Sequence, residues 1–269
     1  MTTIPPNCVV VVPLYKNQLT ANEFQSLVQC DNILNSHDKT FIAPEGLDIS
    51  LITKQFPSFQ ITLFQQHWFL SPDTYSRLLL TKSFYEIFIR YSHLLIYQLD
   101  AFVFRDSLLD WCSQDYDYVG APWLGKNWPN TFLGHINQRL TSPPLFRLLS
   151  WKMLIQRRLL TKKHNLVGNG GLSLRRVSSA IDTLDSLAHY AMQWSWNEDT
   201  FWGIFAPNRR RQYKVPPANI AASFALELEP RLGFEMNNQT LPFGCHAWWS
   251  IDPTFWRPYF ERQGHSIIT

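Results

Sequence analysis

The chain has 269 residues, of which 45% are apolar and 17% charged, a composition typical of a folded globular protein and not of a disordered one. Its formal net charge is only +3, so no global electrostatic field indicates nucleic acid as an obligate partner. Cys8, Cys30, Cys112 and Cys245 are scattered and form no CxxC pair, which fits free thiols in a reducing compartment.

The N-terminus has neither a basic region nor a long apolar core, because only four valines precede Pro13. It therefore does not resemble a signal peptide. The sequence also has no apolar run of 18 residues, the length from which a membrane-spanning helix is expected. We expect a cytoplasmic protein, with peripheral contact to the inner face of a membrane as a further expectation.

The first hundred residues alternate between predicted strands and helices. Strands are predicted at residues 8–14 (CVVVVPL), 39–43, 59–64 (FQITLF) and 94–97 (LLIY), and helices at residues 20–30 and 71–90. Thr20 and Glu23 form a capping box at the start of the first helix, and Pro72 occupies the first position of the second. This alternation predicts an α/β fold with a mainly parallel central sheet flanked by helices.

After residue 101 the pattern is less regular. We predict a short strand at residues 117–121, a glycine turn running into a strand at residues 167–174 and a helix at residues 178–189. The tail from residue 206 is predicted to be loop-rich because of its many prolines, which are Pro207, Pro216, Pro217, Pro230, Pro242, Pro253 and Pro258. We find no repeat or linker, and we predict a single domain over residues 1–269.

A stretch without acidic residues separates Asp117 from Asp182. Its basic residues are Lys126, Arg139, Arg147, Lys152, Arg157, Arg158, Lys162, Lys163, Arg175 and Arg176. Residues 126–164 are predicted to form a basic, partly helical insertion. It is expected to meet an anionic membrane surface or a phosphorylated or nucleic-acid ligand, and a solvated helix face is the plain alternative.

Two segments of the middle of the chain have residues that suit ligand binding. Asp100 closes the segment Gln98-Leu99-Asp100 directly after an apolar strand, where ligands bind in open α/β sheets and where a carboxylate can hold a divalent cation. Capping of a turn explains an aspartate there equally well. The segment at residues 167–171 (VGNGG) has three glycines, which allow the backbone to approach a ligand closely or simply form a turn.

Two later segments add an acidic pair and a histidine. Glu198 and Asp199 are adjacent carboxylates in an aromatic segment, where desolvation raises a carboxyl pKa and suits it to general-base catalysis. The alternative is an ordinary acidic pair at a helix N-terminus. His246, in a loop bounded by glycine and aromatic residues, suits metal ligation through a neutral imidazole or a structural hydrogen bond.

In this order, the four segments resemble the landmarks of GT-A glycosyltransferases, which are the DxD metal motif, a glycine-rich acceptor loop, the xED base motif and a late metal-binding histidine. The strings YQLDAFVF, DYVGAPW, VGNGGLSLRR, NEDTFW and PFGCHAW also resemble a glycosyltransferase-like family with a domain-of-unknown-function label, DUF5672. The resemblance covers about residues 9–249. It implies a GT-A-like, Rossmann-like fold with a nucleotide-sugar-binding half at residues 1–100 and an acceptor-binding and catalytic half at residues 101–269.

The resemblance also implies roles for single residues. Asp100 is expected to hold Mn²⁺ or Mg²⁺ against the donor diphosphate, beside Gln98, and His246 to complete the metal shell. Asp199 is expected to deprotonate the acceptor hydroxyl, with Glu198 orienting it or binding the acceptor. Asn169, Gly170, Gly171 and Trp202 are expected at the acceptor cleft. The donor residues expected from topology are Pro13 and Tyr15 by the nucleobase, and Arg77 and Lys82 by the diphosphate or donor sugar.

The implied partners are a UDP- or GDP-sugar donor and a carbohydrate or lipid-linked glycan acceptor, in the synthesis of a cell-surface polysaccharide or lipopolysaccharide. A base at Asp199 implies an inverting displacement, although a retaining enzyme shares the same landmarks. Gln98 departs from the DxD pattern, since it replaces one anionic ligand by a neutral amide. A binding protein for nucleotide sugars or carbohydrates that has lost catalysis therefore stays open as an alternative. A nucleotidyltransferase is disfavoured because no glycine follows the first strand.

Overall fold

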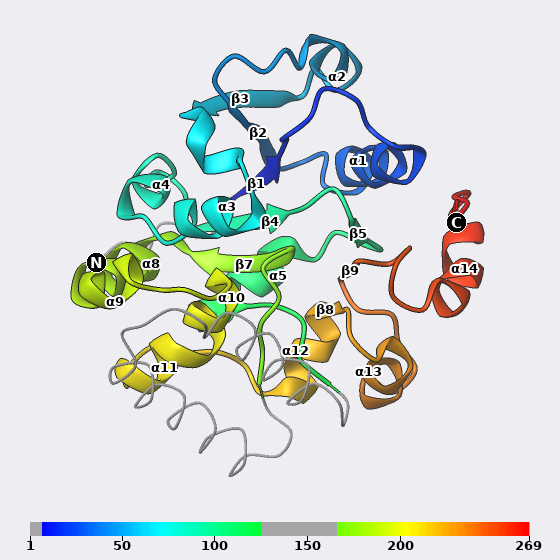
Figure 1. The fold of residues 1–269 in the computed structure, drawn as a ribbon. Coiled ribbons are helices and arrows are strands. Elements are labelled where there is room, and N and C mark those ends of the chain that lie inside the picture. The colour runs from blue at the N-terminus through cyan, green and yellow to red at the C-terminus, as the bar shows by residue number, and fades with distance from the viewer. Residues whose placement is uncertain (1–6, 125–165, 269) are drawn as a thin grey trace, which may run out of the picture.

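The structure, a computed structural model, describes residues 7–124 and 166–268. Within these residues a six-stranded sheet has the order β3 (Phe59–Phe64), β2 (Asp38–Pro44), β1 (Cys8–Pro13), β4 (His93–Tyr97), β7 (Leu172–Arg176) and β6 (Tyr118–Val119). The strands from β3 to β4 are parallel, whereas β7 is antiparallel to both β4 and β6. The predicted mixed α/β fold with a mainly parallel sheet is confirmed (Figure 1).

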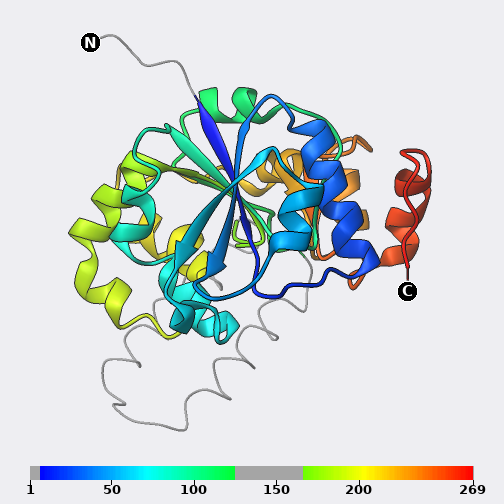
Figure 2. The ribbon, with the colours of Figure 1, turned by 90° about the horizontal axis from the view of Figure 1, so that it is seen from above.

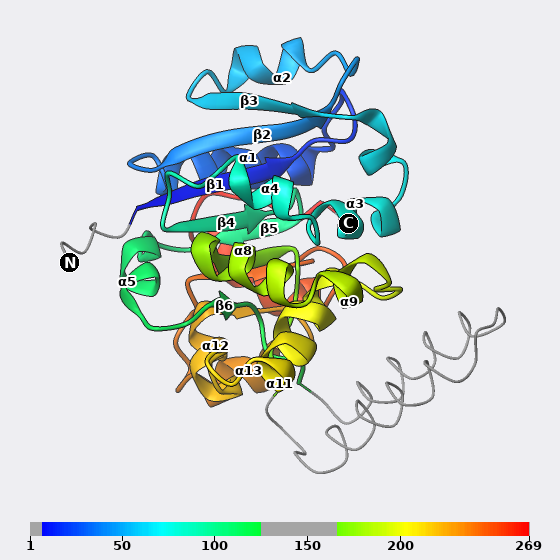
Figure 3. The same ribbon diagram turned by 90° about the vertical axis from the view of Figure 1, so that its left-hand side faces the viewer.

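Both faces of the sheet are buried at its central strands, although the edge strand β3 is largely exposed. Burial on both sides explains why β1 is an unbroken apolar run and not an alternating one. Val10 and Val12 pack into a cluster with α1 (Ala21–Ile33), α2 (Ser50–Gln55) and α5 (Leu108–Ser113). Val9 and Val11 point into a second cluster with α4 (Lys82–Glu86) and α8 (Val177–Ser186). Figure 2 shows the twist of the strands, and Figure 3 shows α8 lying across the sheet on the second face.

A second, smaller sheet lies beyond the end of β4. It consists of β5 (Ala101–Val103), β9 (Gly244–His246) and β8 (Ala225–Leu226), with β9 in the centre. The β5 and β9 strands are antiparallel, whereas β8 and β9 are parallel. Because β5 starts only four residues after β4 ends, this small sheet brings the C-terminal third of the chain to the carboxyl ends of the central strands (Figure 1).

Several predicted elements agree closely with the structure. The predicted strand at residues 59–64 is β3, and the strand at residues 8–14 is one residue longer than β1. At the start of α1, the Thr20 side chain accepts a hydrogen bond from the Glu23 backbone and Glu23 caps the Thr20 backbone in return, so the capping box is present.

The prediction of one long helix at residues 71–90 is wrong. These residues form two short helices, α3 (Pro72–Leu78) and α4, which are separated by an extended Thr81. Leu78, Leu79 and Leu80 are all buried, and three consecutive residues cannot share one face of an α-helix, so the chain leaves the helix to bury them. The helix predicted at residues 178–189 is likewise divided into α8 and α9 (Ala188–Met192).

The tail from residue 206 also has, between its loops, several helices that its prolines did not indicate. They are α11 (Ala206–Arg209), α12 (Ala218–Phe224), α13 (Pro230–Met236) and α14 (Pro253–Glu261). Pro230 and Pro253 occupy the first positions of their helices, and Pro217 is the N-cap of α12. Proline fits the first turn of a helix, where its missing N–H removes no hydrogen bond, so these prolines start helices. The remaining short elements are a 3₁₀-helix at Gln66–Phe69, α10 (Glu198–Thr200) and a π-helical turn at Phe201–Phe205.

The predicted basic insertion at residues 126–164 lies outside the described residues. In the part of the chain that the structure describes, no helix is both long and apolar enough to cross a membrane.

Candidate active site

The strand connections bring Asp100 and His246 together, although the two residues are distant in sequence. Asp100 follows β4 and immediately precedes β5, and the first residue of β5, Ala101, pairs with His246 in β9. The Ala247 backbone N–H also donates to the Asp100 carbonyl oxygen, at 2.9 Å. The His246 side chain consequently lies beside Asp100, with 2.9 Å between His246 Nε2 and Asp100 Oδ1.

Asp100 and His246 shift each other's pKa. Burial alone lowers the pKa of His246, but the neighbouring Asp100 and Glu227 carboxylates outweigh it and raise that pKa to about 10. Burial raises the pKa of Asp100, and His246 more than compensates, so that the net shift is downward. The two carboxylates thus stabilise positive charge at this place, carried either by a proton on the imidazole or by a cation bound in its stead.

Glu227 is one of the site residues that sequence patterns did not reveal. Its Oε1 lies 3.0 Å from His246 Nδ1, on the other edge of the ring from Asp100. Glu227 directly follows the short apolar strand β8. A carboxylate after an apolar pair of residues was the only sequence signal, and two residues are too few to predict a strand.

The glycine loop fits closely against both the histidine and the acidic pair. A Cβ atom on Gly171 would lie 1.9 Å from His246 Nε2, and one on Gly170 would lie 2.4 Å from Glu198 Oε1. Glycine is therefore required here by close approach and not by an unusual φ angle. The loop separates the Asp100–His246 pair from the acidic pair, with one glycine against each.

Replacing Gly171 by alanine should disrupt the Asp100–His246 contact, since the new methyl group and the imidazole cannot occupy the same space. We expect Mn²⁺-dependent binding of UDP or GDP to weaken by about 10- to 100-fold, the usual cost of disturbing the surroundings of a metal ligand. Isothermal titration calorimetry measures this loss. In a His246→Ala background the same substitution should cost little, because the three atoms nearest to the new Cβ all belong to the imidazole. An equal loss in both backgrounds would contradict the steric explanation.

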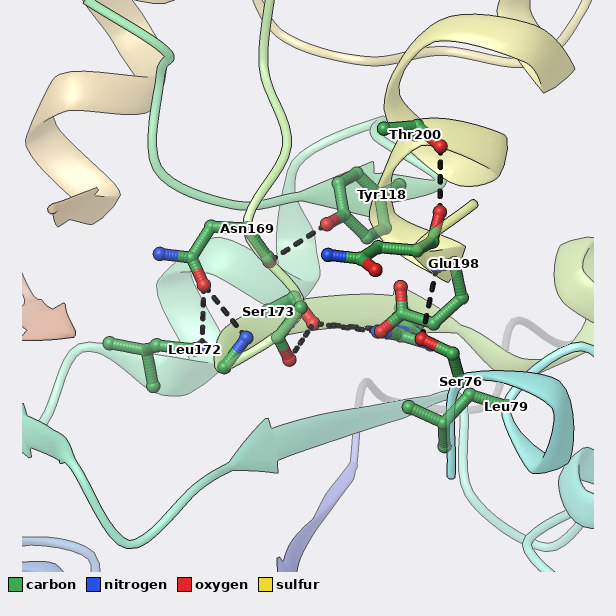
Figure 4. Close-up of polar contacts among 12 residues, drawn as sticks. Ser76, Leu79, Tyr118, Asn169, Leu172, Ser173, Glu198 and Thr200 are labelled. Carbon is green, nitrogen blue, oxygen red and sulfur yellow. Dashed lines mark hydrogen bonds and ion pairs between the residues drawn. The ribbon is translucent and has the colours of Figure 1, made fainter. Parts of the chain in front are cut away.

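Glu198 is buried in an ion pair. Its Oε1 lies 2.7 Å from Arg175 Nη2, and the side chains are only 5% and 1% exposed. Arg175 also donates to the Tyr85 hydroxyl at 2.9 Å and to Ser173 Oγ at 3.1 Å. Figure 4 shows Glu198 beside Ser76, whose Oγ lies 3.4 Å from the Glu198 backbone N–H. This network fixes the orientation of Glu198 beneath the glycine loop.

Two properties of Asp199 suit general-base catalysis. Burial, followed by the charges of Glu198 and Glu227, raises the pKa of Asp199 to about 7. Its Oδ1 is buried and has no hydrogen-bond partner among the described residues. A carboxyl group poised near neutral pH can take a proton from a hydroxyl and later release it.

The Asn169 side chain stabilises the glycine loop through hydrogen bonds to the backbone. It has φ 72°, in the left-handed region, and its Oδ1 accepts hydrogen bonds from the backbone N–H groups of Gly171 at 2.7 Å and Leu172 at 3.3 Å (Figure 4). Its carbonyl oxygen accepts from the Tyr118 hydroxyl at 2.8 Å. The amide Nδ2, by contrast, is buried and has no hydrogen-bond partner in the described part of the chain, so it can donate to a bound molecule.

A pocket with a volume of about 430 Å³ opens next to Asp100. Four residues predicted at the donor site line it, and they are Pro13, Tyr15, Gln98 and Asp100. The aromatic lining that the sequence analysis did not predict consists of Phe69, Tyr75 and Trp249. Its charged lining residues are Glu23 and Asp100, with no lysine or arginine among the described residues around it.

Three of the predicted site residues lie elsewhere. Arg77 is exposed on α3 and does not line the pocket. The Lys82 ammonium lies on α4, 2.8 Å from Asp185 Oδ2 and away from the pocket lining. Trp202 is 1% exposed and packs against Tyr85 in the core, so it offers no face to a ligand.

The comparisons with known proteins identify a family and a fold. Residues 58–246 match the family described as "Protein of unknown function (DUF5672)". A search of curated protein sequences finds no match. Among solved structures, the galactosyltransferase LgtC in complex with donor and acceptor sugar analogues aligns over 97% of each chain, with 12% identity and a TM-score of 0.51.

Two further structures have the same fold. An active-site mutant of LgtC aligns over 97% of each chain, with 12% identity and a TM-score of 0.52. The bifunctional glycosyltransferase WbbM aligns over 92% of this chain and 46% of its own, with 11% identity and a TM-score of 0.51. At such identities the likeness concerns the fold. The chain belongs to the DUF5672 family and has the fold of GT-A glycosyltransferases.

Proposed function

We propose that this protein is a metal-assisted glycosyltransferase that moves a sugar from a nucleotide-sugar donor, UDP- or GDP-linked, to an acceptor hydroxyl. The observation that carries the proposal is the group of buried, unpartnered polar atoms on and around the glycine loop. Among the described residues, Asn169 Nδ2, Glu198 Oε2 and Asp199 Oδ1 have no hydrogen-bond partner, and neither does Tyr75 Oη at the neighbouring pocket. Buried polar atoms are normally satisfied, so such a group indicates a place where a substrate supplies the missing partners.

A divalent cation fits Asp100 and His246 only in company with a diphosphate. Across residues 7–124 and 166–268, no cluster of three or more His, Cys, Asp or Glu side chains is arranged to hold a metal ion alone. Mn²⁺ and Mg²⁺, however, are commonly bound by one or two protein ligands plus substrate phosphates. The absence of a lysine or arginine from the described pocket lining fits the same arrangement. When bound, the cation would neutralise negative charge on the departing diphosphate.

The side chains of the protein bind the nucleotide, accept the proton and orient the acceptor. The aromatic pocket beside Asp100 holds the nucleotide, and Gln98 replaces one anionic ligand by an amide that can hydrogen-bond the ribose or a metal-bound water. Asp199 accepts the proton of the acceptor hydroxyl, and Glu198, held by Arg175, orients that hydroxyl. Asn169 donates to the bound sugar through Nδ2. A base in this role favours inversion, which the anomeric configuration of the product, measured by NMR, distinguishes from retention.

Asp100 provides the direct test of donor binding. In the wild type, a true UDP- or GDP-sugar with Mn²⁺, at 100 times its Kd, stabilises the folded state by about 2.7 kcal/mol, which raises Tm by roughly 5 °C. We expect Asp100→Ala to lose this shift, whereas Asp110→Ala, an exposed aspartate on α5, keeps it. Chelation of the metal should abolish the wild-type shift. A wild type that responds to no nucleotide sugar with Mn²⁺, or an Asp100→Ala variant that keeps the full shift, would contradict the assignment.

The acceptor and pathway are proposed from the sequence alone. The basic segment at residues 126–164 suits an anionic membrane surface, and hence a lipid-linked glycan acceptor in polysaccharide or lipopolysaccharide synthesis. Peripheral membrane contact rests on the same segment. Cytoplasmic placement rests on the scattered cysteines, which suit a reducing compartment.

A further inference from the structure

Glu227 reaches His246 through strand register. In the parallel β8–β9 pair, Ala225 lies opposite Gly244 and Leu226 opposite Cys245. One residue further along, the same register brings Glu227 beside His246, and the observed distance from Oε1 to Nδ1 is 3.0 Å. The Glu227 side chain is 18% exposed and that of His246 12%, so their contact is largely shielded from water.

This contact determines which histidine nitrogen is available as a ligand. A carboxylate can only accept a hydrogen bond, so His246 Nδ1 carries a proton and donates it to Glu227. The ring therefore presents Nε2 toward Asp100, at 2.9 Å. Nε2 is buried and lies close to Asp100, but it forms no hydrogen bond of good geometry with a described residue. It can therefore bind another group.

We propose that Glu227 is a positioning residue, which holds the His246 imidazole so that Nε2 and Asp100 can share a divalent cation. The inference rests on the proposed function, because it presumes a cation at this pair. Metal-ligating histidines commonly donate their second N–H to a carboxylate, which orients the ring and makes it a stronger ligand. Glu227 does not replace the anionic ligand lost at Gln98, because it contacts the nitrogen on the opposite edge of the ring from Asp100.

Two substitutions and a matched control test the proposal on the full chain. Glu227→Gln keeps an acceptor oxygen but removes the charge, and Glu227→Ala removes both. Glu229→Gln removes an equal charge from an exposed side chain two residues further on. Mn²⁺ binding in the presence of UDP or GDP is measured by the loss of the free Mn²⁺ signal in electron paramagnetic resonance, and circular dichroism verifies folding.

We expect Glu227→Gln to weaken Mn²⁺ binding by about 10-fold and Glu227→Ala by up to about 100-fold, with Glu229→Gln unchanged. Both losses should be smaller than that of Asp100→Asn, which changes a direct ligand. In donor hydrolysis, Glu227→Gln should raise the KM for Mn²⁺ while kcat at saturating Mn²⁺ stays within about threefold of the wild type. A general structural defect would not produce this separation of KM from kcat.

Three results would overturn the inference. Wild-type affinity for Mn²⁺ in folded Glu227→Ala would remove the positioning role and leave the proposed function intact. A loss in Glu227→Gln equal to that in Asp100→Asn would make Glu227 a direct ligand. No Mn²⁺ binding by the wild type with either nucleotide would contradict the proposed function and this inference together.

Discussion

Asp199→Asn is expected to lower turnover by about 10²- to 10⁴-fold, the usual contribution of a general base, while nucleotide affinity stays within about twofold. The amide has nearly the same size as the carboxyl group but cannot accept a proton. In the wild type, the base must be ionised, and the pKa of Asp199 is about 7. Turnover should therefore fall about tenfold per unit as the pH drops below 7, and level off above it.

Asp182→Asn, on the exposed side of α8, is the matched control and should behave as the wild type. The decisive measurement pairs transfer or slow donor hydrolysis with calorimetric nucleotide binding. Hydrolysis by the wild type that vanishes in Asp199→Asn establishes an enzyme and excludes a binding protein without catalysis. Weaker nucleotide binding with normal turnover would instead place Asp199 in the donor site.

Asp199→Asn should also be more stable than the wild type at alkaline pH. The folded-state pKa of Asp199 is raised from 3.8 to about 7, so between these values the native state binds more protons than the unfolded state. Stability falls as pH rises through this window, because ionising the buried carboxyl group costs free energy. Asparagine does not ionise, so Asp199→Asn should have the higher Tm at pH 8 and approach the wild type near pH 4. A lower Tm at pH 8 would show that the carboxylate is well solvated or paired.

Arg175→Met is expected to cause the largest loss of stability, about 3–5 kcal/mol in the free energy of unfolding. Its guanidinium group is almost completely buried and lies 2.7 Å from Glu198 Oε1. Removing one partner leaves the other charge buried without compensation, and that costs more than the pair itself contributes. Urea unfolding at neutral pH measures the change.

Arg176→Met provides the control, since Arg176 is the next residue and also forms ion pairs. Its side chain is 30% exposed, and its two partners, Asp115 and the less exposed Asp117, each lie 3.4 Å away, so the loss should be about 1 kcal/mol. In the double variant Arg175→Met with Glu198→Leu, most of the lost stability should return, because apolar residues can replace a buried ion pair. Catalysis should not return with it. A loss below about 1 kcal/mol for Arg175→Met alone would mean that Glu198 is not a buried, ionised partner.

Local sequence patterns were sufficient where a structure depends on neighbouring residues. The valines of β1 and the alternation of strands and helices indicated a buried parallel sheet, and Thr20 with Glu23 located the start of α1. The strand-end Asp100, the glycine loop, the acidic pair and His246 were all identified as segments. Their chemistry depends on residue type, which the sequence states directly.

Contacts between distant segments depended on the tertiary structure. Glu227 lies against His246 only because β8 and β9 pair in one register, and no pattern of two strand residues specifies that register. Lys82 pairs with Asp185 once α3 ends early, and α3 ends early because three consecutive leucines are all buried in the core. The sequence thus determined the elements and the reactive groups, whereas packing and strand register decided which of these groups face one another.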